Sequence, residues 1–392
     1  MDEIALRDFQ PRLQAQTVFK SDAGWFYRIP ALLYERESET ILAFAEQRLS
    51  REDISTKNLV MSTGTLKKPE RTIEWSEHKV VEEAHIDGHR PMNPCLVYEK
   101  NSKTLFLFFI CVEGQVSENW QIENNTNKAR LCYITSKDLG QTWTVVTDLT
   151  DTLCESQNWA TLAVGPGHGF QMRSGTLIVP FHAYVIPHSS GCLSCLKSKK
   201  REKNSPHAYH LFSEDGGKWQ LSKMLQNESI ECEMAEFFDE KDNSLIYCNA
   251  RTRRSYREEA VCGSNNIYTC QPHNDRLVET GQGCQGSVVS FPAQSEDAGE
   301  TSPDLNKWLL FTHPNDKEKR IHLGVYLNRS PKAPSAWSNP WIINSGHSGY
   351  SDLAYLGDGQ FACLMECGEQ TETEKIASVV FSYSEVKQGI GE

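Results

Sequence analysis

Short runs of apolar or alternating residues recur along the whole chain, separated by clusters of Gly, Pro, Asn and Asp. Runs of this length bounded by turn residues are typical of β-strands, and convincing amphipathic helix patterns are scarce. Many short strands at even spacing indicate a sandwich, a barrel or a propeller, and their number here favours a propeller. The pattern predicts strands at 25–34, 41–46, 58–62, 105–112, 130–135, 176–181, 208–213, 234–238, 244–252, 287–291, 308–312, 321–327, 361–367 and 376–383.

A turn motif occurs twice and supports the propeller. Ser-Lys-Asp-Leu-Gly-Gln-Thr-Trp stands at 136–143, and a shorter copy without Thr stands at 213–219. In such a turn Asp caps the backbone through its side chain, Gly takes a strained conformation and Trp packs beneath. Asp138 and Asp215 lie 77 positions apart (215 − 138), which is compatible with a hairpin repeated on successive or alternate blades. The motif predicts architecture and indicates no chemistry.

We interpret the chain as one domain covering 1–392, with two surface insertions. The first, 187–207, contains Cys192, Cys195 and the basic run 197–203, and the second, 294–306, is acidic and polar. Strand patterns resume on both sides of each insertion, so neither is expected to be a domain linker.

The composition narrows the function classes. With 52 acidic and 40 basic residues the net charge is −12, which argues against nucleic-acid binding. An anionic ligand would therefore need a local cluster of arginines. The apolar runs are shorter than the roughly 18 residues of a membrane span, and the first residues lack a secretory signal pattern. The 13 cysteines show no framework spacing and are expected to be reduced thiols of a cytosol-facing protein.

Common nucleotide, metal and nucleophile signatures do not fit this chain. The glycine-rich segment 165–169 lacks dinucleotide-site spacing, and 346–349 is not a nucleophile elbow. Cys192 and Cys195 have no second pair at zinc-finger spacing. We therefore predict neither a metal nor an organic cofactor.

Arg28 stands in the middle of the apolar strand 25–34. A buried guanidinium must be paired, so Arg28 either forms a structural ion pair or faces an anionic ligand. Arg48, Arg251 and Arg320 stand beside other predicted strands, whose ends converge at the centre of a propeller. Several arginines aimed at one point would form a receptor for a carboxylate or a phosphate. Acidic and phenolic residues in comparable places are Asp53, Glu118, Glu231, Glu366 and Tyr350.

The segment Tyr-Arg-Ile-Pro at 27–30 resembles the F/Y-R-I-P motif of sialidases, and 136–143 resembles their Asp-box. The resemblance extends from about 27 to about 383, and the chain looks like the vertebrate exo-α-sialidases of the cytosolic and plasma-membrane type. Segments 109–112, 184–187, 248–251 and 366–368 lean toward the membrane-associated ganglioside sialidases. The resemblance implies a six-bladed β-propeller with its site at the centre.

The resemblance also implies a carboxylate clamp. Arg28, Arg251 and Arg320 would hold the substrate carboxylate, and Glu366 would pair with Arg28. Arg28 would then have both an internal partner and an anionic ligand.

Catalytic roles follow from the same resemblance. Tyr350 matches the nucleophile, Glu231 the carboxylate that activates it, and Asp53 the acid/base. Glu233 is a nearby competitor of Glu231 for the role of base. Two displacements would give retention of configuration.

Further positions match residues that line the sugar's N-acetyl and glycerol pockets: Arg48, Met92, Asn93, Glu118, Tyr184 and Gln285. Met92 and Tyr184 have an alternative interpretation as core residues, and Glu118 as a loop carboxylate. His182 replaces the first tyrosine of the vertebrate Tyr-x-Tyr pair, which changes the glycerol side of the site.

The sequence thus predicts a retaining exo-α-sialidase acting on gangliosides and on other sialylated oligosaccharides and glycoproteins. The alternatives are a non-catalytic Asp-box propeller that binds sialylated ligands, and a trans-sialidase. We expect a peripheral plasma-membrane or cytoplasmic protein that is not secreted through a cleaved signal peptide. The basic run 197–203, with Cys192 and Cys195 nearby, is the candidate membrane contact. The oligomeric state stays open.

Overall fold

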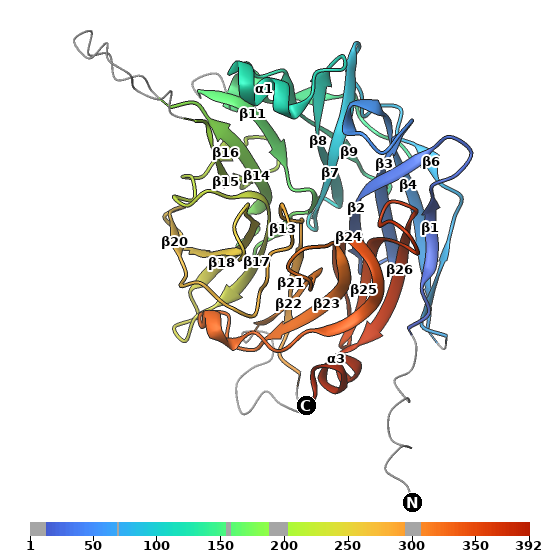
Figure 1. Ribbon diagram of the computed structural model, residues 1–392, viewed down its shortest axis with the longest axis vertical. Helices are drawn as coiled ribbons and strands as arrows, with labels where there is room; N and C mark the ends of the chain where they lie inside the picture. Colours follow the sequence, from blue (N-terminus) through green and yellow to red (C-terminus); the bar gives the residue numbers. More distant parts are fainter. Residues whose placement is uncertain (1–12, 69, 154–157, 188–202, 295–306) are drawn as a thin grey trace, which may run out of the picture.

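The strands follow one another in chain order around a ring (Figure 1). The structure, a computed structural model, describes residues 13–68, 70–153, 158–187, 203–294 and 307–392. The strands are β1 Gln16–Lys20, β2 Phe26–Glu35, β3 Thr40–Arg48, β4 Thr56–Lys67, β5 Thr72–Trp75, β6 Lys79–Val80, β7 His89–Glu99, β8 Thr104–Glu113, β9 Ala129–Ser136, β10 Thr147–Asp148, β11 Trp159–Val164, β12 Gly167–His168, β13 Phe170–Gln171, β14 Leu177–Val185, β15 Ser205–Ser213, β16 Gln220–Leu221, β17 Ile230–Phe238, β18 Ser244–Arg251, β19 Glu258–Cys262, β20 Tyr268–Cys270, β21 Ser287–Pro292, β22 Lys307–Pro314, β23 Ile321–Asn328, β24 Trp341–Gly357, β25 Gln360–Gly368 and β26 Lys375–Ser382. The helices are α1 Glu118–Asn124, α2 Thr150–Leu153 and α3 Tyr383–Ile390, with short 3₁₀ turns η1 Asp53–Ser55 and η2 Pro334–Ala336.

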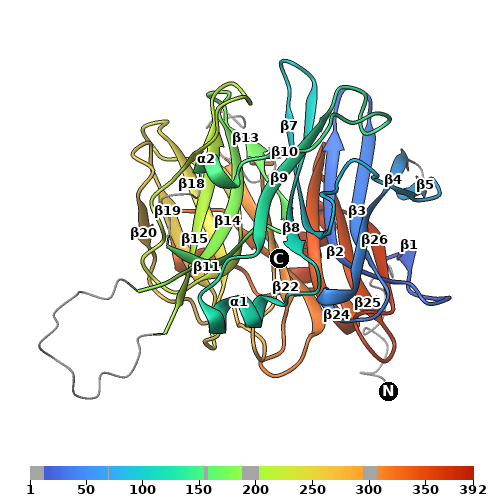
Figure 2. The same ribbon diagram turned by 90° about the horizontal axis from the view of Figure 1, so that it is seen from above.

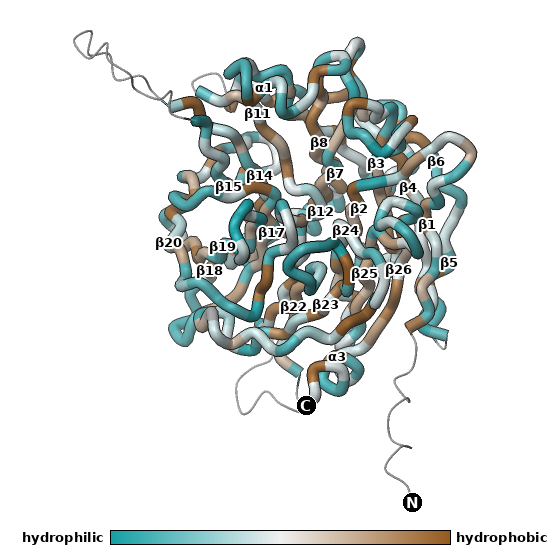
Figure 3. The backbone as a smooth tube through the Cα atoms, viewed as in Figure 1, coloured by the Kyte–Doolittle hydropathy of each residue, from teal (hydrophilic) through white to brown (hydrophobic). Residues whose placement is uncertain are grey.

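The predicted all-β class is confirmed, and each predicted strand lies within an observed strand to within one residue at either end. The apolar runs were informative because these strands are buried along most of their length, as in β8 and β25. Brown, hydrophobic stretches follow such strands in Figure 3, whereas many of the connections are teal.

The arrangement is propeller-like, but the prediction of six blades is wrong, because the described strands do not form six separate hydrogen-bonded sheets. The described strands form five sheets, one of them with seven strands in the order β1-β26-β25-β24-β23-β22-β21. The reason is the 17-residue β24, which pairs with β23 over Trp341–His347 and with β25 from His347 to Gly357. A single strand therefore joins what would otherwise be two sheets.

The ring closes where the first strand pairs with the last one. β1 runs antiparallel to β26, with Gln16 opposite Ser378 and Lys20 opposite Lys375. Segments from the two ends of the described chain therefore share one sheet, seen in Figure 1 as blue beside red.

Apolar cores lie between neighbouring sheets. Phe44 of β3 and Phe109 of β8 belong to one such core, and Phe108 and Phe181 to the next. The two halves of the seven-stranded sheet also pack on each other, with the rings of Phe291 and Phe361 4.9 Å apart edge to face. Burial of such large side chains stabilises each interface.

The repeated turn motif has the predicted geometry. Asp138 accepts hydrogen bonds from the backbone and the hydroxyl of Thr142, at 2.9 and 2.7 Å. Gly140 adopts φ +84°, and the Trp143 ring packs edge-on against Phe44. The copy at 213–219 repeats the Asp215 cap to Gly217 at 2.8 Å. Both turns are structural.

Most of each predicted insertion, namely 188–202 of 187–207 and 295–306 of 294–306, lies outside the described residues, as do Cys192 and Cys195. Among the residues that are described, no helix has the length and apolar character needed to cross a membrane. In Figure 2 the helix α1 lies at one face of the ring.

Candidate active site

A cavity of about 400 Å³ opens at the axis of the ring, on the face where α1 begins. Strand ends from several sheets line it, as expected where the inner strands of a propeller converge. The predicted site residues that line it are Arg28, Arg48, Asp53, Met92, Asn93, Glu118, Glu231, Arg251 and Tyr350. Arg320, Glu366, Tyr184 and Gln285 are not among the residues that line this cavity.

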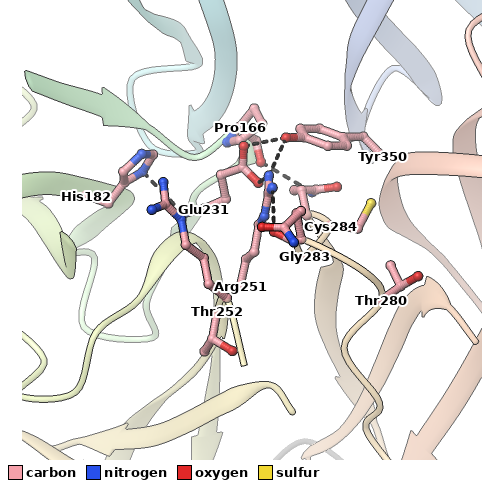
Figure 4. A network of polar contacts seen from close by, with 12 residues as sticks. Pro166, His182, Glu231, Arg251, Thr252, Thr280, Gly283, Cys284 and Tyr350 are labelled. Atoms are coloured by element: carbon pink, nitrogen blue, oxygen red, sulfur yellow. Dashed lines mark hydrogen bonds and ion pairs between the residues drawn. The ribbon is translucent and has the colours of Figure 1, made fainter. Parts of the chain in front are cut away.

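Tyr350, Glu231 and Arg251 form a hydrogen-bonded triangle at the cavity floor (Figure 4). The Tyr350 hydroxyl donates a short hydrogen bond to Glu231 Oε1. Arg251 Nη1 donates to Glu231 Oε2 at 2.7 Å and to the Tyr350 oxygen at 3.0 Å. Residues from β17, β18 and β24, far apart in the sequence, thus meet at one point.

The protonation states of this triangle suit a nucleophile and its base. Burial and the Glu231 carboxylate raise the pKa of Tyr350 above its ordinary value. Burial opposes ionisation of Glu231, but Arg251 and the Tyr350 hydroxyl outweigh it and lower the pKa of Glu231. The free enzyme therefore holds a neutral phenol against a carboxylate that accepts its proton.

The backbone of Glu231 is strained, and His182 supports it. Glu231 has φ +34° at an irregularity in the pairing of β17 with β18, a conformation that side chains other than glycine rarely adopt. Its N–H donates to His182 Nδ1 at 3.3 Å. Burial lowers the pKa of His182 to about 4, so the ring is neutral and Nδ1 can accept this bond. His182 therefore contacts Glu231, the predicted base, directly.

Arg28 has the predicted internal partner. Its Nε and Nη2 donate to the two oxygens of Glu366, each at 3.0 Å, and Glu366 is fully buried. Glu366 also accepts from the backbone N–H groups of Ile29 and Tyr350. Burial acts against it, but Arg28 and these donors lower the pKa of Glu366. One carboxylate thereby positions both Arg28 and the backbone of Tyr350 on β24.

Three guanidinium groups surround Tyr350. Those of Arg28 and Arg320 lie 5.4 and 5.3 Å from the centre of its ring, and Arg251 contacts its hydroxyl. Carbonyl oxygens orient Arg251, at the end of β18, and Arg320, just before β23: Gln282 O accepts from Arg251 at 3.0 Å and Gly283 O from Arg320 at 2.9 Å. The predicted convergence of Arg28, Arg251 and Arg320 is therefore present in the geometry.

Asp53 begins the short turn η1, half-exposed at the cavity. Its backbone oxygen accepts from Arg90 Nε at 3.3 Å, and Arg90 also donates to Gly114 O at 2.6 Å and Val116 O at 2.5 Å. Arg90 is buried and ties the Asp53 loop to the segment that leads into α1. Sequence reasoning missed this residue, although a basic residue inside a motif of apolar and proline neighbours was a usable signal.

Arg48 also has a partner that was not predicted. Glu46, fully buried, accepts from Arg48 Nε at 2.8 Å and from the backbone of Asn93 at 2.8 Å. Asn93 itself has φ +58°. Glu46 therefore fixes two predicted sugar-pocket residues from two different sheets.

Glu118 is the first residue of α1 and faces the cavity. Glu118 as a whole residue is solvent-exposed. Its carboxyl group is nevertheless desolvated by the cavity walls and repelled by the carboxylates of Glu231 and Asp53, and both effects raise the pKa of Glu118 to about 7. This position supports a site residue over a bare loop carboxylate.

The structure distinguishes which of the remaining predicted pocket residues line the cavity and which are packed in a core. Met92 both lines the cavity and belongs to an apolar core. Tyr184 packs in a small core with Ala160 and Ile230, and its hydroxyl accepts from Arg253 at 3.3 Å. Gln285 is buried and accepts from the Ser351 N–H at 3.1 Å. Tyr184 and Gln285 thus support the site from behind in this structure.

The competitor Glu233 does not contact Tyr350. It is fully buried beneath the cavity, near His168 and Asp352. Among the described residues this is one group whose side chains are of metal-ligating types and close together. The carboxylates in it already accept hydrogen bonds from the chain, so the group is well explained without an ion.

Comparisons with known proteins agree with this geometry. Residues 39–363 match the family model described as a BNR repeat-like domain. The chain is 42% identical to Sialidase-3 of Rattus norvegicus, with 92% of each chain covered. It is 39% identical to Sialidase-2 of Cricetulus griseus, over 92% of this chain and 94% of that one. Among solved structures, the Hadza microbial sialidase Hz136 superposes with a TM-score of 0.76 at 20% identity, covering 95% of this chain and 69% of that one.

Proposed function

We propose that this chain, which belongs to the vertebrate sialidase family and is a glycosidase that releases sialic acid by hydrolysis, acts as a retaining exo-α-sialidase through Tyr350, Glu231 and Asp53. The observation that carries this proposal is the triangle of Tyr350, Glu231 and Arg251. A propeller that only binds sialylated ligands has no need of a phenol hydrogen-bonded to a buried base.

A neutral phenol is a suitable nucleophile for this substrate. The anomeric carbon of sialic acid bears a carboxylate, which repels an anionic attacker. As the Tyr350 oxygen bonds to that carbon, its proton passes to Glu231, and the glycosidic bond breaks. Arg251, on both oxygens, stabilises the negative charge that moves from one to the other.

Asp53 supplies the second proton transfer. It protonates the departing glycosidic oxygen, and as a carboxylate it then removes a proton from the water that attacks the glycosyl-enzyme. Tyr350 leaves and regains its proton from Glu231. Two inversions at one carbon give net retention.

The arginines hold the substrate carboxylate. Arg28 uses two of its five guanidinium donors for Glu366, so the opposite edge is free to bind a carboxylate in a bidentate manner. Arg320 uses one donor for Gly283 O. Arg251 donates three hydrogen bonds, to Glu231, Tyr350 and Gln282. We therefore assign it mainly to positioning Tyr350 and Glu231 and less to binding the substrate carboxylate. The sugar's other groups would meet Arg48, Met92, Asn93 and Glu118, with Tyr184 and Gln285 behind them.

We propose that residues 1–392 form one propeller-like domain. The seven-stranded sheet holds it together on one side, since β24 changes partner at His347 and the two halves of the sheet enclose an apolar core.

Gangliosides are the proposed substrates, beside sialylated oligosaccharides and glycoproteins, and peripheral attachment to the plasma membrane is the proposed location. Both rest on the resemblance and on the basic run 197–203. Neutralising that run and replacing Cys192 and Cys195 should move the protein to the soluble fraction. Unchanged fractionation would remove the membrane proposal and leave the reaction untouched.

The deciding experiment is release of a fluorogenic leaving group from an α-sialoside by the wild type and by Tyr350→Phe. We expect turnover by the wild type with release of the α-anomer of sialic acid, and loss of nearly all activity in Tyr350→Phe. No turnover by the wild type would favour a binding propeller, full activity in Tyr350→Phe would refute the nucleophile, and transfer to an added sugar in place of hydrolysis would indicate a trans-sialidase.

A further inference from the structure

Four side chains form a buried cluster on the ring axis, beneath the cavity floor. Asp352 Oδ1 accepts from His168 Nδ1 at 2.6 Å and lies 2.8 Å from Ser287 Oγ, which is also 2.8 Å from Glu233 Oε2. Glu233, Ser287 and Asp352 are fully buried, and the His168 side chain is 12% exposed. We call His168, Glu233, Ser287 and Asp352 the axial hub.

The hub residues lie two positions further along the strands that carry the site residues. Glu233 follows Glu231 on β17, Asp352 follows Tyr350 on β24, and Ser287 follows Gln285 where β21 begins. Two residues return a strand's side chain to the same side. The same strands therefore place one layer of side chains at the cavity and a second, deeper layer in the hub.

The hub also binds backbone groups of the strands around it, including a strand that carries no hub side chain. Leu32 of β2, four residues after Arg28, donates its N–H to Asp352 Oδ2 at 2.7 Å. Val288 of β21 donates to Glu233 Oε2 at 3.2 Å. His168 belongs to β12, which pairs in parallel with β7, the strand of Met92 and Asn93. Strands from across the ring are thus joined at one point on the axis.

Close packing makes the hub stiff. A Cβ added to Gly167, which has φ +119°, would lie 1.8 Å from Glu233 Oε1. Glycine is therefore needed beside the hub, because any side chain would displace Glu233.

We propose that the axial hub is a positioning device that sets the spacing of Tyr350 and Glu231, so that proton transfer and attack occur in one geometry. This inference rests on the proposed function of those two residues. It assigns the hub no contact with substrate: its members act through the strands on which the nucleophile and the base stand.

The hydrogen bonds indicate where the protons lie. Ser287 Oγ accepts from the Leu353 N–H at 3.0 Å and has a single proton to donate, so its contacts to both Asp352 and Glu233 require that one carboxyl be protonated. Asp352 accepts chain N–H groups at 2.7 and 3.0 Å and His168 Nδ1 at 2.6 Å, whereas Glu233 accepts chain N–H groups only at 3.2 and 3.3 Å. The shorter bonds favour charge on Asp352, so we assign the proton to Glu233.

The charges agree with this assignment. Burial and the Asp352 charge raise the pKa of Glu233 well above its ordinary value. Although burial opposes it, the Asp352 carboxylate, which accepts a hydrogen bond from His168 Nδ1, raises the pKa of His168 above its ordinary value. The hub is then a carboxylate and an imidazolium with one neutral acid.

The two acids should therefore respond differently to amide replacement. Asp352→Asn places an amide N–H₂ group where the carboxylate accepted hydrogen bonds from chain N–H groups, and it removes the counter-charge of His168. Glu233→Gln keeps a hydrogen-bond donor toward Ser287. For Asp352→Asn we expect kcat to fall on the order of a hundredfold, the loss that accompanies a misplacement of about 1 Å. For Glu233→Gln we expect a loss below about tenfold. Ser287→Ala, a smaller change that retains folding more readily, should lower kcat between these two values.

Two readouts separate positioning from general damage. The first is the rate at which a 2,3-difluorosialic acid labels Tyr350, followed by intact-protein mass spectrometry, because it reports attack by the nucleophile. The second is the affinity for an unreactive sialic acid analogue, which the arginines hold. In Asp352→Asn and Ser287→Ala the labelling rate should fall with kcat, while the affinity stays within about threefold of the wild type.

Glu259→Gln is the matched control. Glu259 is a buried carboxyl on β19 that accepts from Tyr247 at 2.6 Å and from Trp337 at 2.8 Å, and it does not line the cavity. It should lower the melting temperature without lowering kcat of the folded protein. A comparable loss of kcat in Glu259→Gln would overturn the proposal, as would wild-type kcat in folded Asp352→Asn or Ser287→Ala, or an equal loss of affinity and labelling rate.

The outcomes also separate this inference from the proposed function. If the wild type is labelled at Tyr350 and Tyr350→Phe is not, the function holds, and unchanged labelling of the hub variants then refutes the hub alone. If the wild type itself is not labelled at Tyr350, the proposed nucleophile fails first.

Discussion

Replacing Arg28 by lysine tests the carboxylate clamp, because lysine retains the charge and removes the planar fork. Arg28 binds Glu366 through Nε and Nη2 and leaves the rest of its guanidinium for a ligand. An ammonium group is a single point of three donors, so it cannot present one edge to Glu366 and another to a substrate carboxylate.

The loss of activity can be worked out from these contacts. Arg28→Lys should lose about one charge-assisted hydrogen bond to the substrate, roughly 1.5–3 kcal/mol. At about 1.4 kcal/mol for each factor of ten, kcat/KM should fall roughly 10- to 150-fold. The fold should lose less, about 1 kcal/mol, because Glu366 keeps the N–H groups of Ile29 and Tyr350 and the Arg28 side chain is 15% exposed.

The assay compares kcat/KM on a fluorogenic α-sialoside with the melting temperature of the same variant. Arg130→Lys is the matched control, since Arg130 on β9 also bridges two carboxylates, Asp148 and Asp151, but lies outside the cavity lining. It should show a similar small change in melting temperature and wild-type kcat/KM. A folded Arg28→Lys with unchanged kcat/KM would return Arg28 to a purely structural ion pair.

Three further variants address the other parts of the site. Glu231→Gln removes the base that takes the Tyr350 proton, so kcat should fall roughly 10²- to 10⁴-fold; a loss below about tenfold in steady-state assays would contradict this role. Glu118, with its pKa raised to about 7, is neutral below that pH and negative above it, so the wild-type kcat/KM for an anionic sialoside should fall as the pH rises through about 7. Glu118→Gln should lose that part of the pH profile, and an unchanged profile would assign it to another group. In Arg90→Lys the hydrogen bonds to the carbonyl oxygens of Asp53, Gly114 and Val116 should be lost, which would displace the Asp53 loop. A substrate with a poor leaving group depends on protonation by Asp53, so its kcat/KM should fall about tenfold more than that of a substrate with a good leaving group. Equal losses for the two substrates would argue against a role of Arg90 through Asp53.

Strands could be predicted where the strand is buried along its length, because its apolar run then stands in one segment of the sequence. β8 is buried at nearly every position, so its apolar run is visible in the sequence alone. β24 was not predicted, because its first half, through Gly346 and His347, is polar and partly exposed while its second half is buried. β24 is one continuous strand because its first part pairs with β23 and its second part with β25, and such pairing depends on the tertiary structure. The sheet count was wrong for this reason.

Site residues were predictable as charges in unusual places, but their partners were not. Arg28, Arg251 and Arg320 stand far apart in the chain, and only closure of the ring brings them to Tyr350. The sequence does not show the partners of Glu46 and Arg90: Glu46 accepts a hydrogen bond from Asn93 on another sheet, and Arg90 donates to the carbonyl oxygen of Gly114. A sequence shows which groups need partners, whereas topology decides which partners they find.

The choice between Glu231 and Glu233 illustrates the limit most clearly. Both acids stand on one strand at a spacing that turns them to the same side, so periodicity could not separate a base from a structural acid. Depth separates them. The 13% exposed Glu231 carboxylate meets Arg251 and the Tyr350 hydroxyl, which favour its charge, whereas the fully buried Glu233 meets Asp352, which disfavours it. Two chemically identical side chains two residues apart thus differ in protonation because each strand passes from the cavity into the hub. The same step along β24 separates the proposed nucleophile, Tyr350, from Asp352, a fully buried carboxylate outside the cavity lining.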